Sequence, residues 1–204
     1  MSSAVKISTG PRFHSERYPM RRYIITTGIP ASGKTTIGLA IANALGLEML
    51  DKDEILEALF DAKGVGDVAW RTHLSRAADE ILREKAVRLE GAVITSWWRH
   101  PLSSTASGTP VEWLSNLNGV LIEVHCVCNP HVATKRFKSR QRHEGHLDQS
   151  KPYSDLLNTF EQQAVLGPLG VGLLIEVNTE QIVEISIVLA RIDSLSKSES
   201  GEAG

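Results

Sequence analysis

The sequence predicts an α/β fold built on one parallel β-sheet, and three observations support this prediction. Apolar strand-like segments alternate with helical segments from residue 23 to residue 195. The stretches between strands are long enough to hold a helix, which consecutive parallel strands require. The first strand-like segment, residues 23–27 (YIITT), runs into the glycine-rich stretch GIPASGKTT and then into a helical pattern. We therefore expect helices on both faces of the sheet.

The remaining elements follow in chain order. A short strand at residues 48–50 ends in Asp51-Lys52-Asp53 and leads into a helix, and a long helix follows Asp67, a suitable N-cap. We expect further strands at 92–96, 120–127 and 173–177, and further helices at 110–117, from 130 through 142, at about 154–163 and at 180–195. Four strands after the first, each separated by helical sequence, give a five-stranded sheet.

Length and composition indicate one folded domain. The chain has 204 residues, a hydrophobic share of 42% and a net charge of −2, which gives no overall signature of nucleic-acid binding. No apolar run reaches membrane-spanning length, and Cys126 and Cys128 are interpreted as buried thiols, so we expect a cytoplasmic protein. Residues 1–22 are basic and are predicted to form a flexible lead-in, with a transit peptide or a start at Met20 as alternatives. The domain is expected to span 23–195, and 196–204 to form a disordered tail.

The stretch GIPASGKTT fits the phosphate-binding pattern G-x-x-x-x-G-K-[ST]. The first N–H groups of a helix lack intrahelical partners and point at a bound anion. Lys34 is predicted to reach the β- and γ-phosphates of ATP, and the Thr35 hydroxyl to ligate Mg²⁺. The expected nucleotide-binding residues of this loop are Gly28, Ala31, Ser32, Gly33, Lys34, Thr35 and Thr36. The alternative is a chance loop of Gly, Ser and Lys.

Two aspartates follow the second strand. Asp51 and Asp53 lie at the carboxyl end of a strand, the edge of an open α/β sheet where ligands bind. A kinase that acts on a hydroxyl needs a carboxylate to orient that hydroxyl and accept its proton. Asp53 is our candidate for this base and substrate-binding role, and Asp51 for supporting Mg²⁺. The alternative is that Asp53 only caps its helix.

A basic segment, about residues 131–146, is predicted to form a helical lid. Arg136 and Arg140 share one helix face, and Glu144 is the only acid in the run. We expect Arg136 and Arg140 to stabilise charge on the transferred phosphoryl group, Arg142 to bind the nucleotide, and Gly145 to allow a hinge. The alternative is a solvated helix face.

Past the third strand lie Trp97, Trp98 and Arg99. Many P-loop kinases carry an acid for Mg²⁺ at this strand end, but Thr95 and Ser96 occupy it here. Trp97 and Arg99 are candidates for an acceptor pocket, while one of the two tryptophans is expected in the core.

Taken together, these motifs resemble the nucleoside-monophosphate-kinase-like branch of P-loop kinases, in particular small kinases of the chloramphenicol phosphotransferase, gluconate kinase and zeta-toxin type. The matching pieces are GIPASGKTT, DKDEILEALF, VLIEVHCVC, RFKSRQRHEGH and IEVNTE. The resemblance implies a P-loop NTPase sheet of order 2-3-1-4-5 with a helical lid, ATP and Mg²⁺. It also implies lid roles for Arg136, Arg140 and Arg142, and a position for Asn178 and Thr179 beside the nucleotide base. The triple-glycine acceptor loop of shikimate kinase is not found.

The sequence therefore predicts a kinase that transfers the γ-phosphate of ATP to a hydroxyl of a small molecule. One alternative is a nucleotide-binding switch or ATPase without a phosphorylated acceptor, which the missing acid favours. Another is a kinase of nucleic-acid ends or tRNA. The expected partner is a small-molecule acceptor, not a membrane or nucleic acid, and the oligomeric state stays open.

Overall fold

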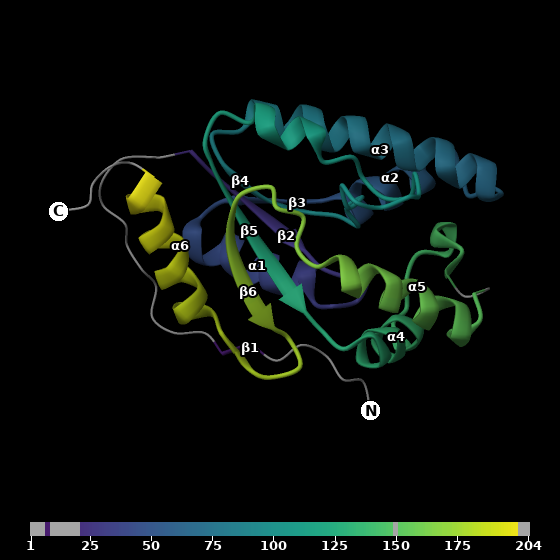
Figure 1. Ribbon diagram of the computed structural model, residues 1–204. Helices are drawn as coiled ribbons and strands as arrows, with labels where there is room; N and C mark the ends of the chain where they lie inside the picture. Colours follow the sequence, from purple (N-terminus) through teal and green to yellow (C-terminus); the bar gives the residue numbers. More distant parts are fainter. Residues whose placement is uncertain (1–6, 9–20, 149–150, 200–204) are drawn as a thin grey trace.

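A five-stranded parallel sheet forms the centre of the protein (Figure 1). The computed structural model describes residues 7–8, 21–148 and 151–199. The sheet contains β2 (Arg22–Thr27), β3 (Glu48–Asp51), β4 (Ala92–Thr95), β5 (Val120–Val127) and β6 (Leu173–Asn178). They lie in the order β3-β4-β2-β5-β6. Numbered along the chain, this is 2-3-1-4-5, so the predicted topology is confirmed.

The described residues form six α-helices and two short 3₁₀ helices. Figure 1 shows how the α-helices are arranged around the sheet. The α-helices are α1 (Lys34–Leu45), α2 (Lys52–Lys63), α3 (Val68–Arg88), α4 (Pro130–Ser139), α5 (Tyr153–Leu166) and α6 (Ile185–Glu199). The 3₁₀ helices are η1 (Glu112–Asn116) and η2 (Glu144–His146). Helices α1 and α6 pack on one face of the sheet, while α3 and η1 pack on the other.

The central strand shows why both faces are covered. In β2, Ile24 is buried in the cluster under α1 and α6, and its neighbour Ile25 is buried in the cluster under α3. Successive strand residues point to opposite faces, so a strand apolar at both positions needs a helical layer on each side. Two smaller clusters hold the outer helices. One joins α4 to α5 through Phe137 and Phe160, and the other joins α2 to α3.

The two ends of the domain differ from the predicted boundaries. Within the expected lead-in, β1 (Ile7–Ser8) pairs in parallel with β7 (Val183–Glu184). Helix α6 continues to Glu199, so residues 196–199 are helical and the disordered tail was predicted to start too early. Ser196 is buried there, with its hydroxyl donating to the Ile192 carbonyl. Residues 1–6, 9–20 and 200–204 lie outside the described residues, where lead-in and tail stay predictions. None of the described helices is long and apolar enough to cross a membrane.

All five strands run the same way, so their carboxyl ends meet at one edge. The phosphate-binding loop follows β2 at this edge, and Asp51 closes β3. Trp97 follows β4, and Cys128 leads from β5 into α4. The sheet therefore gathers the predicted functional residues from distant parts of the sequence.

Candidate nucleotide and acceptor site

A cavity of about 600 Å³ lies over the carboxyl edge of the sheet. Its first wall is the phosphate-binding loop and the start of α1, and its second is formed by α4, α5 and the segment between them. Residues from the ends of β3 and β4, with Arg71 of α3, close the third side. The lining includes the predicted residues Ala31, Gly33, Lys34, Thr35, Thr36, Asp51, Asp53, Trp97, Arg136, Arg140 and Arg142. One cavity thus holds most of the predicted nucleotide and acceptor residues.

The phosphate-binding loop has the tight backbone that its glycines predict. Gly28 and Gly33 have φ values of 121° and 98°, a left-handed region that favours glycine. A Cβ at Gly28 would lie 2.5 Å from the Cys126 carbonyl oxygen, so the loop also needs glycine there to pass β5. Ala31 takes a φ of 59°, which costs an L-residue energy. Such strain in a binding loop is maintained by the packing around it.

Lys34 begins α1 and points back into the loop. Its ammonium donates to the carbonyl oxygens of Gly28 at 2.9 Å and Ile29 at 2.8 Å. Burial lowers the pKa of Lys34 to about 8, partly offset by Cys126 and Asp53. Removing the charge from water is costly, and the loop carbonyls only partly replace hydration. The lysine is therefore a cation that a polyphosphate in the cavity would stabilise.

Thr35 and Asp51 form the candidate metal position. The Thr35 hydroxyl donates to Oδ2 of Asp51 at 3.0 Å, while Oδ1 of Asp51 accepts from the Asp53 N–H at 2.8 Å. Burial, and then the charge of Asp53, raise the pKa of Asp51 to about 6. A carboxylate whose charged form is this costly gains from a bound cation. Two protein oxygens fit Mg²⁺, which fills its other positions with water and phosphate oxygens. The described residues contain no cluster of three or more His, Cys, Asp or Glu side chains for a metal.

The contacts of Asp51 also show which aspartate caps α2. Asp51, not Asp53, is the N-cap of α2, because its side chain accepts from the Asp53 N–H. Asp53 therefore does not cap the helix, and its half-exposed side chain faces the cavity. Partial burial would raise its pKa, but nearby positive charge, that of Arg142 above all, lowers it. Asp53 is thus held as a carboxylate.

Arg142 lies beside Asp53 in the cavity wall, and its predicted contact with the nucleotide stays a prediction. Its guanidinium donates to Asp53 and to Asp148, each at 2.5 Å. Arg140 stacks over the Phe137 ring at 4.5 Å and lies 3.9 Å from Asp148. The sequence showed only one acid within the basic segment, but these two arginines have acidic partners from outside it. The interpretation that the basic segment has almost no acidic partners is therefore wrong for Arg140 and Arg142.

Arg136 has a different setting from the other two arginines. It donates to the Thr179 carbonyl at 3.0 Å and to the Cys128 sulfur at 3.4 Å, next to the end of β6. It also lines the cavity. Arg136 therefore joins α4 to the loop after β6 at the edge of the cavity.

The turn η2 fastens the predicted lid to α2. His146 contacts Glu57 at 2.7 Å, His143 contacts Asp61 at 3.2 Å, and Arg71 donates to the His146 carbonyl at 3.0 Å. The rings of His143 and Phe60 stack with centroids 5.2 Å apart. A Cβ at Gly145 would lie 2.4 Å from that phenyl ring. Glycine there permits close packing, which the sequence did not indicate.

The family of this chain is shown by its similarity to known proteins. A family model described as "AAA domain" matches residues 24–162, more than half of the chain. This chain belongs to the AAA domain family. The matched region of this AAA domain protein runs from β2 through most of α5 and so includes the cavity walls.

Solved structures show how widely the fold of this AAA domain protein is shared. A Chloroflexus aurantiacus protein proposed to be a kinase aligns with a TM-score of 0.69 at 24% identity, covering 86% of this chain and 98% of that one. A gluconokinase from Sinorhizobium meliloti 1021 aligns with a TM-score of 0.53 at 16% identity, covering 91% and 99%. At these identities the likeness shows the P-loop kinase fold.

Curated relatives match over shorter stretches. A shikimate kinase from Corynebacterium jeikeium is 54% identical over 33 residues, 16% of this chain and 18% of that protein. A shikimate kinase from Chlorobium chlorochromatii is 34% identical over 79 residues, 35% of this chain and 42% of that protein. The chain thus spans less than half the length of the curated relatives it matches.

Five predicted site residues lie outside the main cavity lining. Thr179 is buried, with its hydroxyl donating to the Ser32 carbonyl. Gly28 lines a smaller neighbouring pocket, and Ser32 is fully buried beneath the loop. Arg99 donates to the carbonyls of Ala106 and Gly108, so it supports a loop rather than the acceptor pocket. Asn178 accepts from the Glu180 N–H at the exposed end of β6. Of the two tryptophans, Trp98 is core, donating to the Thr26 carbonyl, and Trp97 lines the cavity.

The structure adds cavity residues that the sequence prediction did not include. Those from α5 and the segment before it are Asp148, Lys151, Asp155, Leu156, Thr159 and Phe160. The α5 members recur at a spacing of four residues, which marks one helix face. That spacing could have been found in the sequence, but nothing local shows that the face meets the phosphate-binding loop.

Proposed function

We propose that this protein is an ATP-dependent kinase that transfers the γ-phosphate to a hydroxyl group of a small molecule. The observation that carries the proposal is that Lys34 and Thr35 line the same cavity as the carboxylate of Asp53. A phosphate-binding loop alone would suit any nucleotide-binding protein. An ionised carboxylate across the cavity, held by Arg142, adds what a hydroxyl acceptor needs.

The donor side follows from the loop and the first turn of α1. Backbone N–H groups at a helix start bind phosphate oxygens, and Thr35 and Thr36 lie in that turn. The ammonium of Lys34 moves from the loop carbonyls to the β- and γ-phosphates. Thr35 and Asp51 would hold Mg²⁺, which when bound would supply positive charge beside the phosphate oxygens.

On the acceptor side, Asp53 orients the attacking hydroxyl. The acceptor oxygen bonds to the γ-phosphorus, the bond to the bridging oxygen breaks, and its electron pair stays on ADP. The proton of the hydroxyl passes to the Asp53 carboxylate. Arg142 lowers the pKa of this carboxyl, which keeps it ionised and positions it. In a loose phosphoryl-transfer transition state, positioning contributes more than strong basicity.

Arg140 and Arg136 supply positive charge along the opposite wall. Burial, and then the nearby Arg142, lower the pKa of Arg140 to about 10. Its charged form is therefore destabilised and gains from an anionic partner. Developing charge on the transferred group would provide that partner.

The proposal is tested by measuring ADP formation against a panel of acceptors, with ³¹P NMR of the products. The panel contains shikimate, gluconate, neutral sugars, nucleosides and aminoglycoside or chloramphenicol-type antibiotics. We expect one acceptor class to raise ADP formation at least tenfold over the acceptor-free rate and to yield a phosphate ester. ADP formation that no acceptor raises would contradict the proposal.

A nucleotide-dependent switch is the second candidate, because Thr95 and Ser96 stand where many P-loop kinases carry an acid. Both residues line the cavity. This candidate predicts ATP binding with slow hydrolysis and no phosphate ester in the same assay. The position of Asp51 beside Thr35 favours the kinase, because it supplies an acid for Mg²⁺ from a neighbouring strand.

A further inference from the structure

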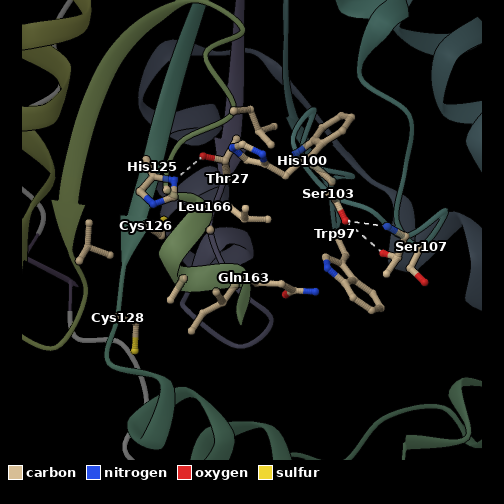
Figure 2. Close-up of a pocket in the computed structure, with 18 residues that line it drawn as sticks. Thr27, Trp97, His100, Ser103, Ser107, His125, Cys126, Cys128, Gln163 and Leu166 are labelled. Carbon is tan, nitrogen blue, oxygen red and sulfur yellow. Dashed lines mark hydrogen bonds between the residues drawn. The ribbon is translucent and has the colours of Figure 1, made fainter. Parts of the chain in front are cut away.

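A second pocket, of about 110 Å³, has Gly28 and Ile29 of the phosphate-binding loop in its lining. Figure 2 shows the side chains around it. Its walls are the carboxyl ends of β2 and β5, the segment from Trp97 to Ser107, and the last turns of α5. Trp97 lines this pocket and also the main cavity. The two spaces are therefore neighbours that share one aromatic wall.

The described lining of the pocket contains no Asp, Glu, Lys or Arg. It consists of hydroxyl, thiol, amide, imidazole, indole and aliphatic groups. Burial lowers the pKa of His125, despite the nearby Glu123, so the imidazole is neutral at neutral pH. This differs from the main cavity, whose walls carry several cations and acids. A charged ligand group would lose hydration here without finding a counter-charge.

A hydrogen-bond relay sets the protonation of His125, and Figure 2 shows its last link, the hydrogen bond between Thr27 and His125. Glu123 is fully buried, and its carboxylate accepts from the backbone N–H groups of Leu169, Gly170 and Val171. It also accepts the hydroxyl proton of Thr27 at 2.7 Å. The Thr27 oxygen, 2.9 Å from Nδ1 of His125, must then accept the Nδ1 proton. Nε2 of His125 is therefore the unprotonated nitrogen, a hydrogen-bond acceptor.

Gln163 contributes a second acceptor from α5. It lines the same pocket, and its Oε1 is buried without a hydrogen-bond partner among the described residues. A buried acceptor left unpaired costs free energy. A ligand that suits both Nε2 of His125 and Oε1 of Gln163 must carry at least two donors without a charge. Hydroxyl groups meet this requirement.

We propose that this pocket is a binding site for an uncharged, hydroxyl-bearing group of the acceptor, and that Trp97 is the wall it shares with the main cavity. The pocket's selectivity follows from its own residues. Only the statement that the bound group belongs to the acceptor rests on the proposed function. The acceptor is then a polyhydroxylated molecule whose uncharged part lies near His125, while the hydroxyl to be phosphorylated faces Asp53.

The test follows the ¹⁵N resonances of histidine in the full-length protein, with His125→Gln used to assign the His125 signals. Erythritol is the probe, and succinate, which also has four carbons but carries two charges, is the matched comparison. We expect erythritol to shift the Nε2 resonance of His125 saturably, with a Kd on the order of 10 mM, the range for so small a ligand. Succinate should leave it unchanged.

Two substitutions separate the relay from general packing. Thr27→Val keeps the side-chain shape but breaks the relay, and Gln163→Leu removes the second acceptor. Each should weaken erythritol binding by about tenfold. His131→Gln, on an α4 histidine whose side chain is 60% exposed, is the matched control and should have no effect. Unchanged histidine resonances elsewhere show that each variant is folded.

The proposed binding site is refuted if erythritol causes no saturable shift of the His125 resonance. It is also refuted if the shifts are equal in wild type, Thr27→Val and Gln163→Leu. The acceptor assay separates this result from the proposed function. If erythritol binds but no acceptor is phosphorylated, the pocket stands and the kinase proposal fails. If an acceptor is phosphorylated with the same KM in all three proteins, the subsite assignment fails while the kinase proposal stands.

Discussion

Replacing Asp51 with Asn should make the protein more stable near neutral pH while impairing its proposed magnesium-dependent activity. Asp51 is 6% exposed, and its pKa is raised from 3.8 to about 6 by burial and then by the charge of Asp53. Asn keeps the size of the side chain and is a good N-cap, so it can still accept the Asp53 N–H. The substitution therefore removes mainly the charge.

The magnitude follows from proton linkage. A folded-state pKa about two units above the unfolded value corresponds to about 3 kcal/mol once the group is fully ionised, at 1.36 kcal/mol per unit. The folded protein binds this proton more tightly than the unfolded chain, so the contribution to stability falls as pH rises from about 4 through about 6. Because the site opens into a solvated cavity and Asp53 is half exposed, we expect about 1–3 kcal/mol of stabilisation at pH 7.5.

Urea unfolding of wild type and Asp51→Asn at pH 4.5 and pH 7.5 measures the effect. The difference between the two proteins should be largest at pH 7.5 and should shrink at pH 4.5. Glu84→Gln, on an α3 side chain that is 60% exposed, is the control and should show no pH-dependent difference. The reasoning is refuted if Asp51→Asn is less stable than wild type at pH 7.5, or if its advantage is the same at both pH values.

Three further predictions concern the loop, the carboxylate and the lid turn. Lys34→Ala should reduce acceptor phosphorylation by at least about a hundredfold, because its ammonium is the loop's charge for the transferring phosphates, while the urea midpoint stays close to wild type. Asp53→Asn should lower kcat by about a hundredfold and change the KM for ATP only a few-fold, since the amide cannot accept the proton. Gly145→Ala should destabilise the protein by about 1–3 kcal/mol in urea unfolding, because its Cβ would overlap the Phe60 ring. Combining it with Phe60→Leu should recover part of that loss.

A specific experimental result would contradict each of these three predictions. Turnover by Lys34→Ala near the wild-type rate would contradict the phosphate-loop assignment. Full activity of Asp53→Asn, together with an inactive Asp51→Asn, would show that the roles of the two aspartates are reversed. Additive losses in the Gly145→Ala and Phe60→Leu double variant would show that these two residues do not share the contact that we infer.

The sequence by itself determined the sheet and the position of the phosphate-binding loop. The alternating apolar segments predicted the five strands, and GIPASGKTT predicted both the loop and its strand–helix setting. These are local signals, because strand burial, glycine-dependent turns and helix starts are decided by neighbours along the chain. The same local logic placed Asp51 and Asp53 at the carboxyl edge. It did not decide which of them caps α2, since that depends on side-chain geometry.

Only the tertiary structure decided how charges pair across the site. Arg142 meets Asp53 across 89 residues of sequence, and η2 reaches Glu57, Phe60 and Arg71 on two other helices. The sequence alone therefore shows almost no acidic partners for the arginines of the basic segment, because those partners lie outside the segment. The relay from Glu123 through Thr27 to His125 likewise needs β2 beside β5 and the loop after α5 folded over both. Such contacts have no signature in local spacing, because strand order and helix docking bring their members together.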